Sequence, residues 1–487
     1  MKSLAQLALD SAVALRASYA DARLVRIRNR GLTTKNGRVG HASESDSLGI
    51  AIRVIADGAW GFAASSDLSR RAVESTAVQA VEIAKASARV KQQDVRLAPE
   101  PPAVAEWSTP FRIDPFTTSI EQNIKLLLKV DGELRAVKGV TLAETGMNFA
   151  REESWFLSSE GADIHQTKYS SGAGYTAYSF QKSEIQKRSH PNSFGGQWQS
   201  KGYELIEELQ LLENARRVGE EAVALHHADQ CPEGVFTVIL DGSQLGLQIH
   251  ESIGHPIELD RVLGMEANFA GTSFLTLDKL RNLRYGSELV NVVADARQQH
   301  GPGLGMFAYD DEGVAAQCTP IITQGEFTGY LSSRETAHTI DATRSGGTLR
   351  AEGWNRLPII RMTNVSILPG EKPLTREQLI ADTEHGIYME TNKSWSIDDK
   401  RYNFQFGCEI GWEIKNGKRV RMLKNPSYSG ITTEFWNSMD AICSRDEWVL
   451  WGTPNCGKGQ PQQVIGTGHG AAPARFRNIK VGSAYQG

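Results

Sequence analysis

Alternating hydrophobic and polar positions predict that the chain opens with a helix followed by antiparallel strands. Residues 4–17 place their hydrophobic side chains on one helical face. Val25 and Ile27 alternate with arginines, which is typical of a half-exposed strand. Asn36-Gly37 is a hairpin turn signal, and the apolar run 49–56 predicts another strand. This opening therefore predicts a small antiparallel sheet.

The pattern continues with helices and strands up to about residue 225. Asp67 is expected to cap a helix that runs to about residue 89. Five prolines make residues 97–115 an extended crossing segment. Residues 140–180 are rich in strand formers with glycine turns, and residues 203–225 have the period of one amphipathic helix. Mixed helices and strands thus occupy the first half.

The second half has a different texture and defines a second domain. After residues 226–234 the chain shows short strands and many glycines, with one further helix predicted over residues 375–384. A length of 487 residues also favours more than one hydrophobic core. We therefore expect an α+β protein with two domains. Residues 1–228 form a mixed domain with an antiparallel sheet, and residues 229–487 form a mostly β domain that carries a metal-site helix.

Composition excludes several classes of function and location. A net charge of −4, with no basic stripe and no helix-turn-helix, predicts no nucleic-acid partner. No run of 18 apolar residues is present, so no membrane span is predicted. The N-terminus lacks the apolar core of a signal peptide. The five cysteines are odd in number and contain no CxxC pair, which favours a reducing cytoplasm over a disulfide framework.

The candidate chemistry centres on the sequence His250-Glu251-Ser252-Ile253-Gly254-His255. Two imidazoles beside a carboxylate are the groups that hydrolytic zinc sites use, where the carboxylate takes a proton from metal-bound water. The histidines are five residues apart, whereas the common zinc motif spaces them by four. A regular helix would separate them by about 140°. We therefore expect a π-type or broken turn, which Gly254 and Pro256 also favour.

Two histidines leave a catalytic zinc site one protein ligand short. The candidates for the third ligand are Cys456, His469, Glu258, Asp260, His300 and His338. Cys456 lies in a glycine-rich loop near Lys458, where it could be a reactive thiolate. An ordinary free thiol is the alternative for this loop cysteine, and His469 is the rival ligand. Local chemistry leaves the choice open.

Several motifs together resemble the TldD/PmbA family of metallopeptidases. They are Tyr19 to Arg23 with the hairpin of residues 49–62, Gln248 to Asp260, Pro302-Gly303 with Tyr309 to Gly313, Gly346 to Arg350 with Pro358 to Asn364, and Cys456 to Gln460. The chain resembles the TldD type of subunit, because PmbA (TldE)-type subunits lack the metal motif. The C-terminal segment, residues 482–487, departs from the usual glycine-glycine tail.

The resemblance implies a function and a set of site residues. His250, His255 and Cys456 are the expected zinc ligands, and Glu251 is the expected general base. The family fold is α+β, and its subunits pair into dimers that enclose a cavity and cleave unfolded or extended peptides. The partner subunit is then a second copy or a PmbA/TldE-type subunit. The substrate-binding candidates are Arg361, Gly346 and Gly347.

Two other functions remain open from the sequence. One is a non-enzymatic regulatory protein of the DNA gyrase modulator type, a name that members of the family have carried. The other is a zinc amidohydrolase that acts on a small molecule. Stoichiometric zinc and cleavage of an unfolded peptide would favour the peptidase.

Overall fold

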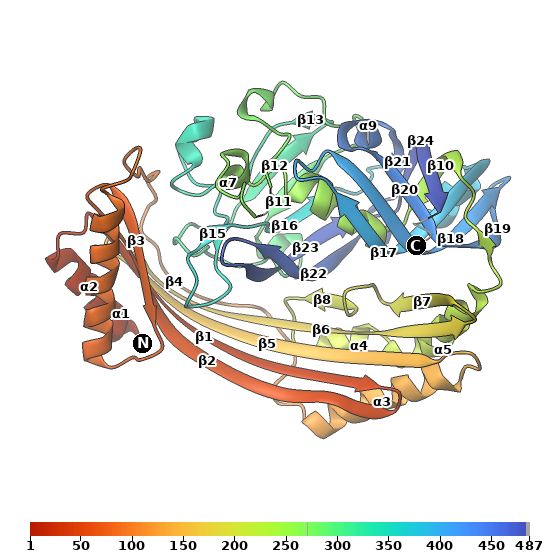
Figure 1. Ribbon diagram of the computed structural model, residues 1–487, viewed down its shortest axis with the longest axis horizontal. Helices are drawn as coiled ribbons and strands as arrows, with labels where there is room; N and C mark the ends of the chain where they lie inside the picture. The colour runs from red at the N-terminus through yellow and green to blue at the C-terminus, as the bar shows by residue number, and fades with distance from the viewer. Residues whose placement is uncertain (270, 484–487) are drawn as a thin grey trace.

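Long antiparallel strands form a bowed sheet that runs the length of the molecule (Figure 1). The structure is a computed structural model that describes residues 1–269 and 271–483, so the end of the atypical C-terminal tail lies outside the described residues. The N-terminal half contains α1 (Lys2–Ala14), β1 (Tyr19–Lys35), β2 (Arg38–Ala56), β3 (Ala59–Ser65), α2 (Arg70–Ser87), β4 (Val104–Ser108), α3 (Ile120–Ala136), β5 (Leu142–Ser158), β6 (Asp163–Gln181), β7 (Glu184–His190), β8 (Gln197–Gln199), α4 (Glu204–Glu208) and α5 (Leu211–Ala224).

The sheet order is β3-β2-β1-β5-β6-β4, with β7 and β8 also paired to β6. All these pairs are antiparallel except β4 with β6. Side chains alternate between the two faces of a strand. On β1, Leu24 packs in the core beneath α1 and α2, and Leu32 packs beneath α3 and α5. Arg23 and Ile27 point to the opposite face, where the second half of the chain lies.

The expected opening of helix, strands and helix is confirmed, including the turn at Asn36-Gly37 between β1 and β2. Two local predictions were wrong. Asp67 does not cap α2, because its carboxylate accepts from the Ser69 N–H and the Ser69 side chain takes the cap position. The predicted helix 203–225 is two helices, since Gln210 adopts a left-handed conformation (φ 46°) between α4 and α5.

The C-terminal half is mostly β, as expected, and the described residues form two large sheets and a two-stranded sheet of β14 and β15. One large sheet has the order β17-β10-β24-β20-β18-β19-β9, and the other has the order β13-β12-β11-β16-β23-β22. Its elements are β9 (Asp229–Gln230), β10 (Gly234–Leu240), α6 (Gly242–Ile249), α7 (Leu259–Val262), β11 (Val292–Asp295), β12 (Cys318–Thr323), β13 (Glu326–Phe327), β14 (Leu349–Arg350), β15 (Ile359–Ile360), β16 (Asn364–Ile367), α8 (Arg376–Ala381), β17 (His385–Ile397), β18 (Asn403–Lys415), β19 (Lys418–Lys424), β20 (Pro426–Ile431), α9 (Thr432–Asn437), β21 (Met439–Ile442), β22 (Val449–Lys458), β23 (Gln463–Ala471) and β24 (Ala474–Ser483).

This β-rich half sits in the concave side of the bowed sheet (Figure 1). Trp354 anchors the contact, because its indole N–H donates to Ser47 Oγ (2.9 Å) and its ring lies where a Cβ on Gly49 would be. The Arg334 guanidinium adds a paired ion bridge to Glu160 (2.7 and 3.1 Å). These contacts fix the second half of the chain against the sheet.

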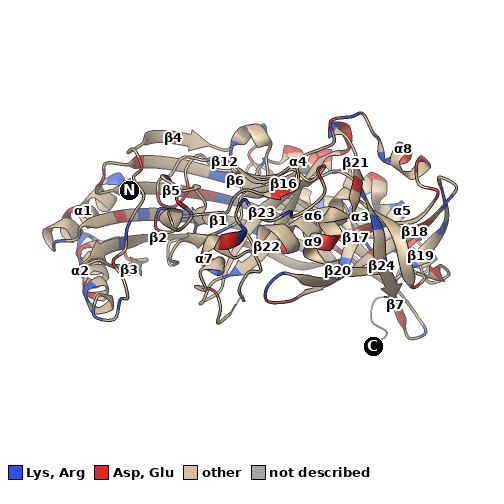
Figure 2. Cartoon of the chain, turned by 90° about the horizontal axis from the view of Figure 1, so that it is seen from above, with Lys and Arg blue, Asp and Glu red and all other residues tan. Residues whose placement is uncertain are grey.

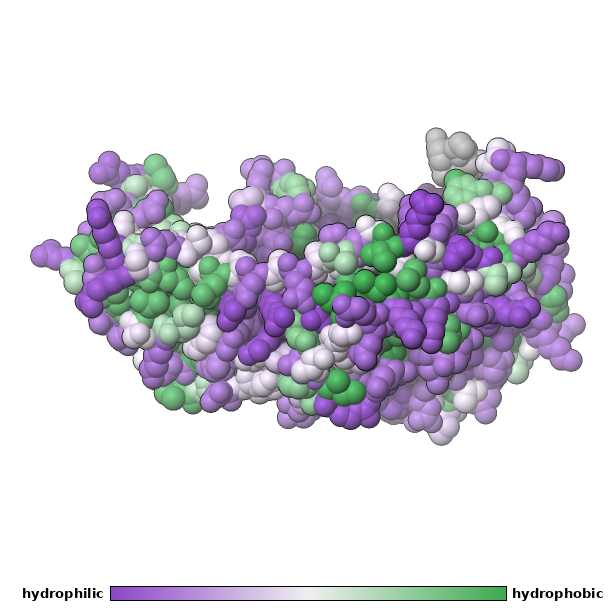
Figure 3. All heavy atoms as spheres, turned by 90° about the horizontal axis from the view of Figure 1, so that it is seen from below, coloured by the Kyte–Doolittle hydropathy of each residue, from purple (hydrophilic) through white to green (hydrophobic). Residues whose placement is uncertain are grey.

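Basic and acidic residues are interspersed along the helices and strands, as the view from above shows (Figure 2). From below, hydrophobic side chains gather at the end formed by α1 and α2 (Figure 3), where Val13, Val78 and Ile83 are exposed. Among the described residues, no helix combines the length and apolar character needed to cross a membrane.

Candidate metal centre

The first two metal-ligand candidates follow a short buried helix. Strand β10 ends at Leu240, and Asp241 then caps α6 by accepting from the Ser243 N–H (2.9 Å). Tyr388 donates its hydroxyl to the other oxygen of Asp241 (2.9 Å) and fixes this cap. All eight residues of α6 are buried. The helix is therefore rigidly held, and it delivers His250 at its C-terminal end.

The five-residue spacing produces the widened turn that the sequence predicts. Residues His250–Gly254 form a π-turn, in which the His255 N–H donates to the His250 carbonyl (3.1 Å). The π-turn brings the two imidazoles to the same side, with ring centroids 4.8 Å apart. A side chain at Gly254 would overlap the sulfur of Met362, so a larger residue here would have to displace the Met362 side chain. The motif thus combines a widened turn with close packing behind it.

Cys456 reaches the two histidines from the hairpin of β22 and β23. The pairing of these strands shifts between Thr453 and Cys456, at Pro454-Asn455, and such bulges re-aim neighbouring side chains. The Cys456 Sγ lies 3.8 Å from His255 Nε2. One ligand atom from each of His250, His255 and Cys456 lies within 4.8 Å of the others, and all three residues are buried.

Hydrogen bonds of their Nδ1 atoms orient the imidazoles of His250 and His255. His250 Nδ1 lies 2.7 Å from His469 Nε2, and His469 Nδ1 lies 2.9 Å from the Val365 carbonyl. Only an N–H can donate to that carbonyl, so His469 Nε2 is the acceptor and His250 Nδ1 is the donor. His255 Nδ1 donates to Glu258 Oε2 (3.0 Å). The Nε2 lone pair of each imidazole is then left for a metal.

The protonation states of these groups suit metal binding. Burial lowers the pKa of His250 and His255, which favours the neutral imidazoles that coordinate metals. Burial raises the pKa of the Cys456 thiol, but the nearby His255 and Arg361 lower it by more, so that its pKa is below the usual range. A lower pKa favours the thiolate, which is the form that binds a metal.

Glu251 is held beside this cluster by an arginine from a distant turn. Arg401, in the β17–β18 connection, donates from Nη1 to Glu251 Oε2 (2.6 Å). The Glu251 side chain is 8% exposed and the Arg401 side chain is 17% exposed. The carboxylate therefore has a fixed position next to His250.

A buried ion network supports the His255 side. Glu258 is fully buried, and its second oxygen lies 3.5 Å from Lys458 Nζ. Lys458, also fully buried, donates to both oxygens of Asp260 (2.7 and 2.9 Å) and to the Ile360 carbonyl (2.7 Å). Because Lys458 and His255 outweigh the effect of burial, the pKa of Glu258 lies well below its usual range. Glu258 is thus ionised when it accepts from His255.

The donor set fits zinc. Tetrahedral zinc binds nitrogen at about 2.0–2.1 Å and sulfur at about 2.3 Å, which places such ligand atoms roughly 3.6 Å apart. The 3.8 Å between Cys456 Sγ and His255 Nε2 is close to that value. Two neutral imidazoles and a thiolate also leave a fourth position open, as catalytic zinc sites require. These residues could therefore hold zinc.

The remaining ligand candidates are engaged elsewhere. His469 and Glu258 orient His250 and His255, and Asp260 pairs with Lys458. His300 bonds to Ser366 Oγ (2.9 Å), and His338 is exposed. The geometry therefore favours Cys456 as the third ligand.

The substrate-binding candidates have other contacts in the structure. Arg361 is 1% exposed, and its guanidinium donates to the carbonyls of Cys456 (2.5 Å) and Gln463 (3.2 Å). The backbone N–H groups of Gly346 and Gly347 donate to serine hydroxyls. Arg361 thus fixes the hairpin that carries Cys456, and a role of these three residues in binding substrate stays a prediction.

Sequence reasoning missed two features of the site. Arg401 carries no motif, and its place beside Glu251 follows only from the fold of a turn 150 residues away. Glu258 and His469 were considered only as ligands. The spacing of three residues between His255 and Glu258 was the available signal for a second role, because a single turn brings residues this far apart within reach of each other.

Family models place the chain among known proteins. Residues 233–483 match the PmbA/TldA metallopeptidase C-terminal domain, residues 20–84 match domain 1, and residues 113–226 match the central domain. The chain belongs to the PmbA/TldD metallopeptidase family. It is therefore a metallopeptidase, and the resemblance inferred from the motifs is confirmed.

Individual relatives agree with this assignment. A metalloprotease of Methanocaldococcus jannaschii is 30% identical over 455 residues, which cover 93% of this chain and 95% of the relative. A zinc metalloprotease TldD homolog of Saccharolobus solfataricus is 29% identical over 250 residues, or 51% of this chain and 52% of the relative. A Thermotoga maritima structure, described as a candidate modulator of a DNA gyrase, has a TM-score of 0.77 with 16% identity and 99% coverage of both chains, which supports the fold.

Proposed function

We propose that the chain is a zinc-dependent metallopeptidase that hydrolyses unfolded or extended peptides. The observation that carries the proposal is the group of His250, His255 and Cys456, with both imidazole Nδ1 atoms engaged behind it and Glu251 next to it. The zinc assignment is also supported by the name of the Saccharolobus relative.

In this proposal, zinc bound by His250, His255 and Cys456 would act as a Lewis acid, which would polarise the scissile carbonyl and lower the pKa of water from 15.7 to about 7. Glu251 acts as the general base that takes a proton from the attacking water and later delivers it to the leaving amine. Arg401 holds the Glu251 carboxylate in place through the 2.6 Å bond. His469 and Glu258 keep the two imidazoles oriented.

Burial of the site supports an extended substrate. His250, His255 and Cys456 are each 4% exposed. A folded protein surface could not bring its backbone to such a site, whereas a single extended strand needs only a narrow path. We further propose a dimer, either with a second copy or with a PmbA/TldE-type subunit, and a cytoplasmic location.

Glu251→Gln tests the proposal. The variant should lose peptide hydrolysis and retain zinc, because glutamine cannot accept the proton and Glu251 is not one of the three ligands. Hydrolysis of an unfolded reporter peptide and zinc content should be measured on the same preparation, with the wild type as control. Retention of full activity would show that Glu251 is not the base.

A further inference from the structure

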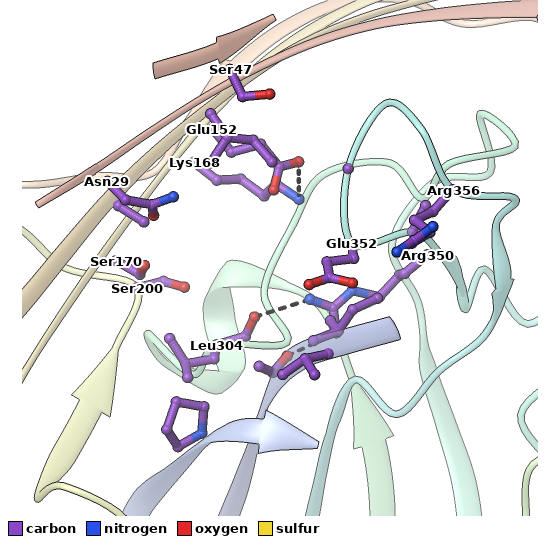
Figure 4. Close-up of a pocket in the computed structure, with 18 of the residues that line it drawn as sticks. Asn29, Ser47, Glu152, Lys168, Ser170, Ser200, Leu304, Arg350, Glu352 and Arg356 are labelled. Atoms are coloured by element: carbon purple, nitrogen blue, oxygen red, sulfur yellow. Dashed lines mark hydrogen bonds and ion pairs between the residues drawn. The ribbon is translucent and has the colours of Figure 1, made fainter. Parts of the chain in front are cut away.

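A cavity of about 540 Å³ lies between the concave face of the N-terminal sheet and the C-terminal half (Figure 4). Asn29 on β1, Ser47 on β2, and Lys168 and Ser170 on β6 line one side. Residues 350–356 and the β22–β23 hairpin line the other side. Hydroxyl, amide and charged groups therefore face the same space from both halves of the chain.

Arg350 is the most buried charge on this cavity wall, with 8% of its surface exposed. Its guanidinium donates to three backbone carbonyls, those of Met362 (2.9 Å), Gly466 (3.0 Å) and Leu304 (3.4 Å). Within residues 1–269 and 271–483, no carboxylate lies within the 4.0 Å ion-pair distance of it. A buried cation without an ionised partner is costly, and a bound anion would reduce that cost.

The other charges of the wall leave an excess of positive charge. Glu152 pairs with Lys168 (2.7 Å), as Figure 4 shows, and Asp311 pairs with Arg23 (3.3 Å). Three charged side chains of the wall then remain without an ion pair among the described residues, namely Arg350, Arg356 and Glu352. Glu352 is solvent-exposed, so water screens it more than Arg350. The inner part of the cavity is therefore positive.

Arg350 keeps its charge at neutral pH. Burial, together with repulsion from Arg361, lowers the pKa of Arg350 to about 10. This value is still well above neutrality, so the guanidinium remains a cation. It is a planar donor suited to carboxylates.

The cavity adjoins the strand that carries the candidate metal ligand Cys456. Ile465, which lines the cavity, is the register partner of Cys456 across β22 and β23. Directly opposed residues in an antiparallel pair lie about 4.5–5.5 Å apart. Arg361 directly follows β15, the strand that pairs with the Arg350 strand β14, and it donates to the Cys456 carbonyl. A peptide that occupied the cavity would thus lie close in space to the metal cluster.

We propose that this cavity binds a carboxylate of the peptide substrate at Arg350. The carboxylate belongs either to an acidic side chain or to the C-terminus of the peptide. The inference rests on the proposed peptidase function. It adds a charge preference that the metal cluster alone does not imply.

Binding of four labelled peptides tests this inference. The full chain carrying Glu251→Gln is titrated into each of four fluorescein-labelled octapeptides made of alanine and serine. The four peptides combine a central Glu or Gln with a free or an amidated C-terminus. Fluorescence anisotropy should show that one acidic form binds at least about tenfold more tightly than its neutral counterpart, the size expected of a charge-assisted hydrogen bond. The Glu/Gln pair and the free/amidated pair identify which carboxylate is bound. Equal affinities within both pairs would overturn the proposal.

Two variants connect the preference to the cavity. Arg350→Met should abolish it, and so should Ser170→Glu, which adds a competing carboxylate on the opposite wall and leaves the three carbonyl contacts of Arg350 in place. Ser43→Glu is the matched control, since Ser43 is an exposed residue of the same sheet outside the cavity lining. Survival of the preference in Ser170→Glu would contradict the assignment even if Arg350→Met fails to fold. Peptide binding is measured here without hydrolysis. A failure of the proposed hydrolytic mechanism would therefore appear in the hydrolysis assay and not in these affinities.

Discussion

Replacing Glu258 by glutamine should weaken metal binding although Glu258 is not one of the three proposed ligands. Its carboxylate accepts from His255 Nδ1 (3.0 Å) and lies 3.5 Å from both Lys458 Nζ and Arg261 Nε. Glutamine keeps the size of the side chain and one acceptor oxygen. It removes the negative charge that makes the His255 imidazole a stronger donor to a metal.

The expected loss can be estimated from this geometry. Loss of a partner behind a metal-binding histidine costs about 10–100-fold in metal affinity, or about 1.4–2.7 kcal/mol. The charge lost here is fully buried, so solvent screens it little. Lys458 keeps two bonds to Asp260, so the fold around the site should survive. We therefore expect a zinc dissociation constant raised within this range.

Competition with a chromogenic zinc chelator at pH 7 measures the dissociation constant of metal-depleted wild type and variant. Glu409→Gln is a matched control, because Glu409 is also fully buried and lies 3.5 Å from a lysine, Lys187, and 3.3 Å from an arginine, Arg188. The control should bind zinc like the wild type. Wild-type affinity in Glu258→Gln, or an equal loss in both variants, would refute the role given to Glu258.

Three further predictions concern stability. Burial raises the pKa of the Glu312 carboxyl from 4.5 to about 7, so the stability that its proton contributes is complete below about pH 4.5 and is lost as pH rises through about 7. The midpoint temperature of thermal unfolding should fall as the pH rises from 5 to 8, and it should fall less in Glu312→Gln. An equal dependence on pH in the variant would contradict this. Gly132→Ala should raise the free energy of unfolding by about 0.5–1 kcal/mol, because an added Cβ on α3 meets no atom within 4 Å. Gly49→Ala should lower it by about 1–3 kcal/mol through overlap with Trp354, and urea unfolding that gives both variants the same sign would refute the packing argument.

Local chemistry predicted the features that depend on a few neighbouring residues. Asn36-Gly37 forms the turn between β1 and β2, since both residues take positive φ (49° and 76°) as the predicted hairpin turn requires. The spacing of His250 and His255 predicted the π-turn, because no regular helix brings both to one side. In both cases the deciding contacts lie within six residues.

Features that depend on the fold were not predictable in this way. The break at Gln210 has no glycine or proline to mark it, and the hydrophobic period continues across it. Arg401 meets Glu251 only because the β17–β18 turn folds over α6 and its π-turn. Cys456 came from the family resemblance, since local chemistry could not separate it from His469. In the structure both ring nitrogens of His469 are occupied, which favours the thiol.

Metal analysis of purified wild type and Cys456→Ala tests the central claim most directly. We predict about one zinc per chain in the wild type and a large loss in Cys456→Ala. Cys443→Ala, which removes another buried free thiol, should retain the metal. Stoichiometric zinc with unchanged affinity in Cys456→Ala would contradict the proposed site of His250, His255 and Cys456.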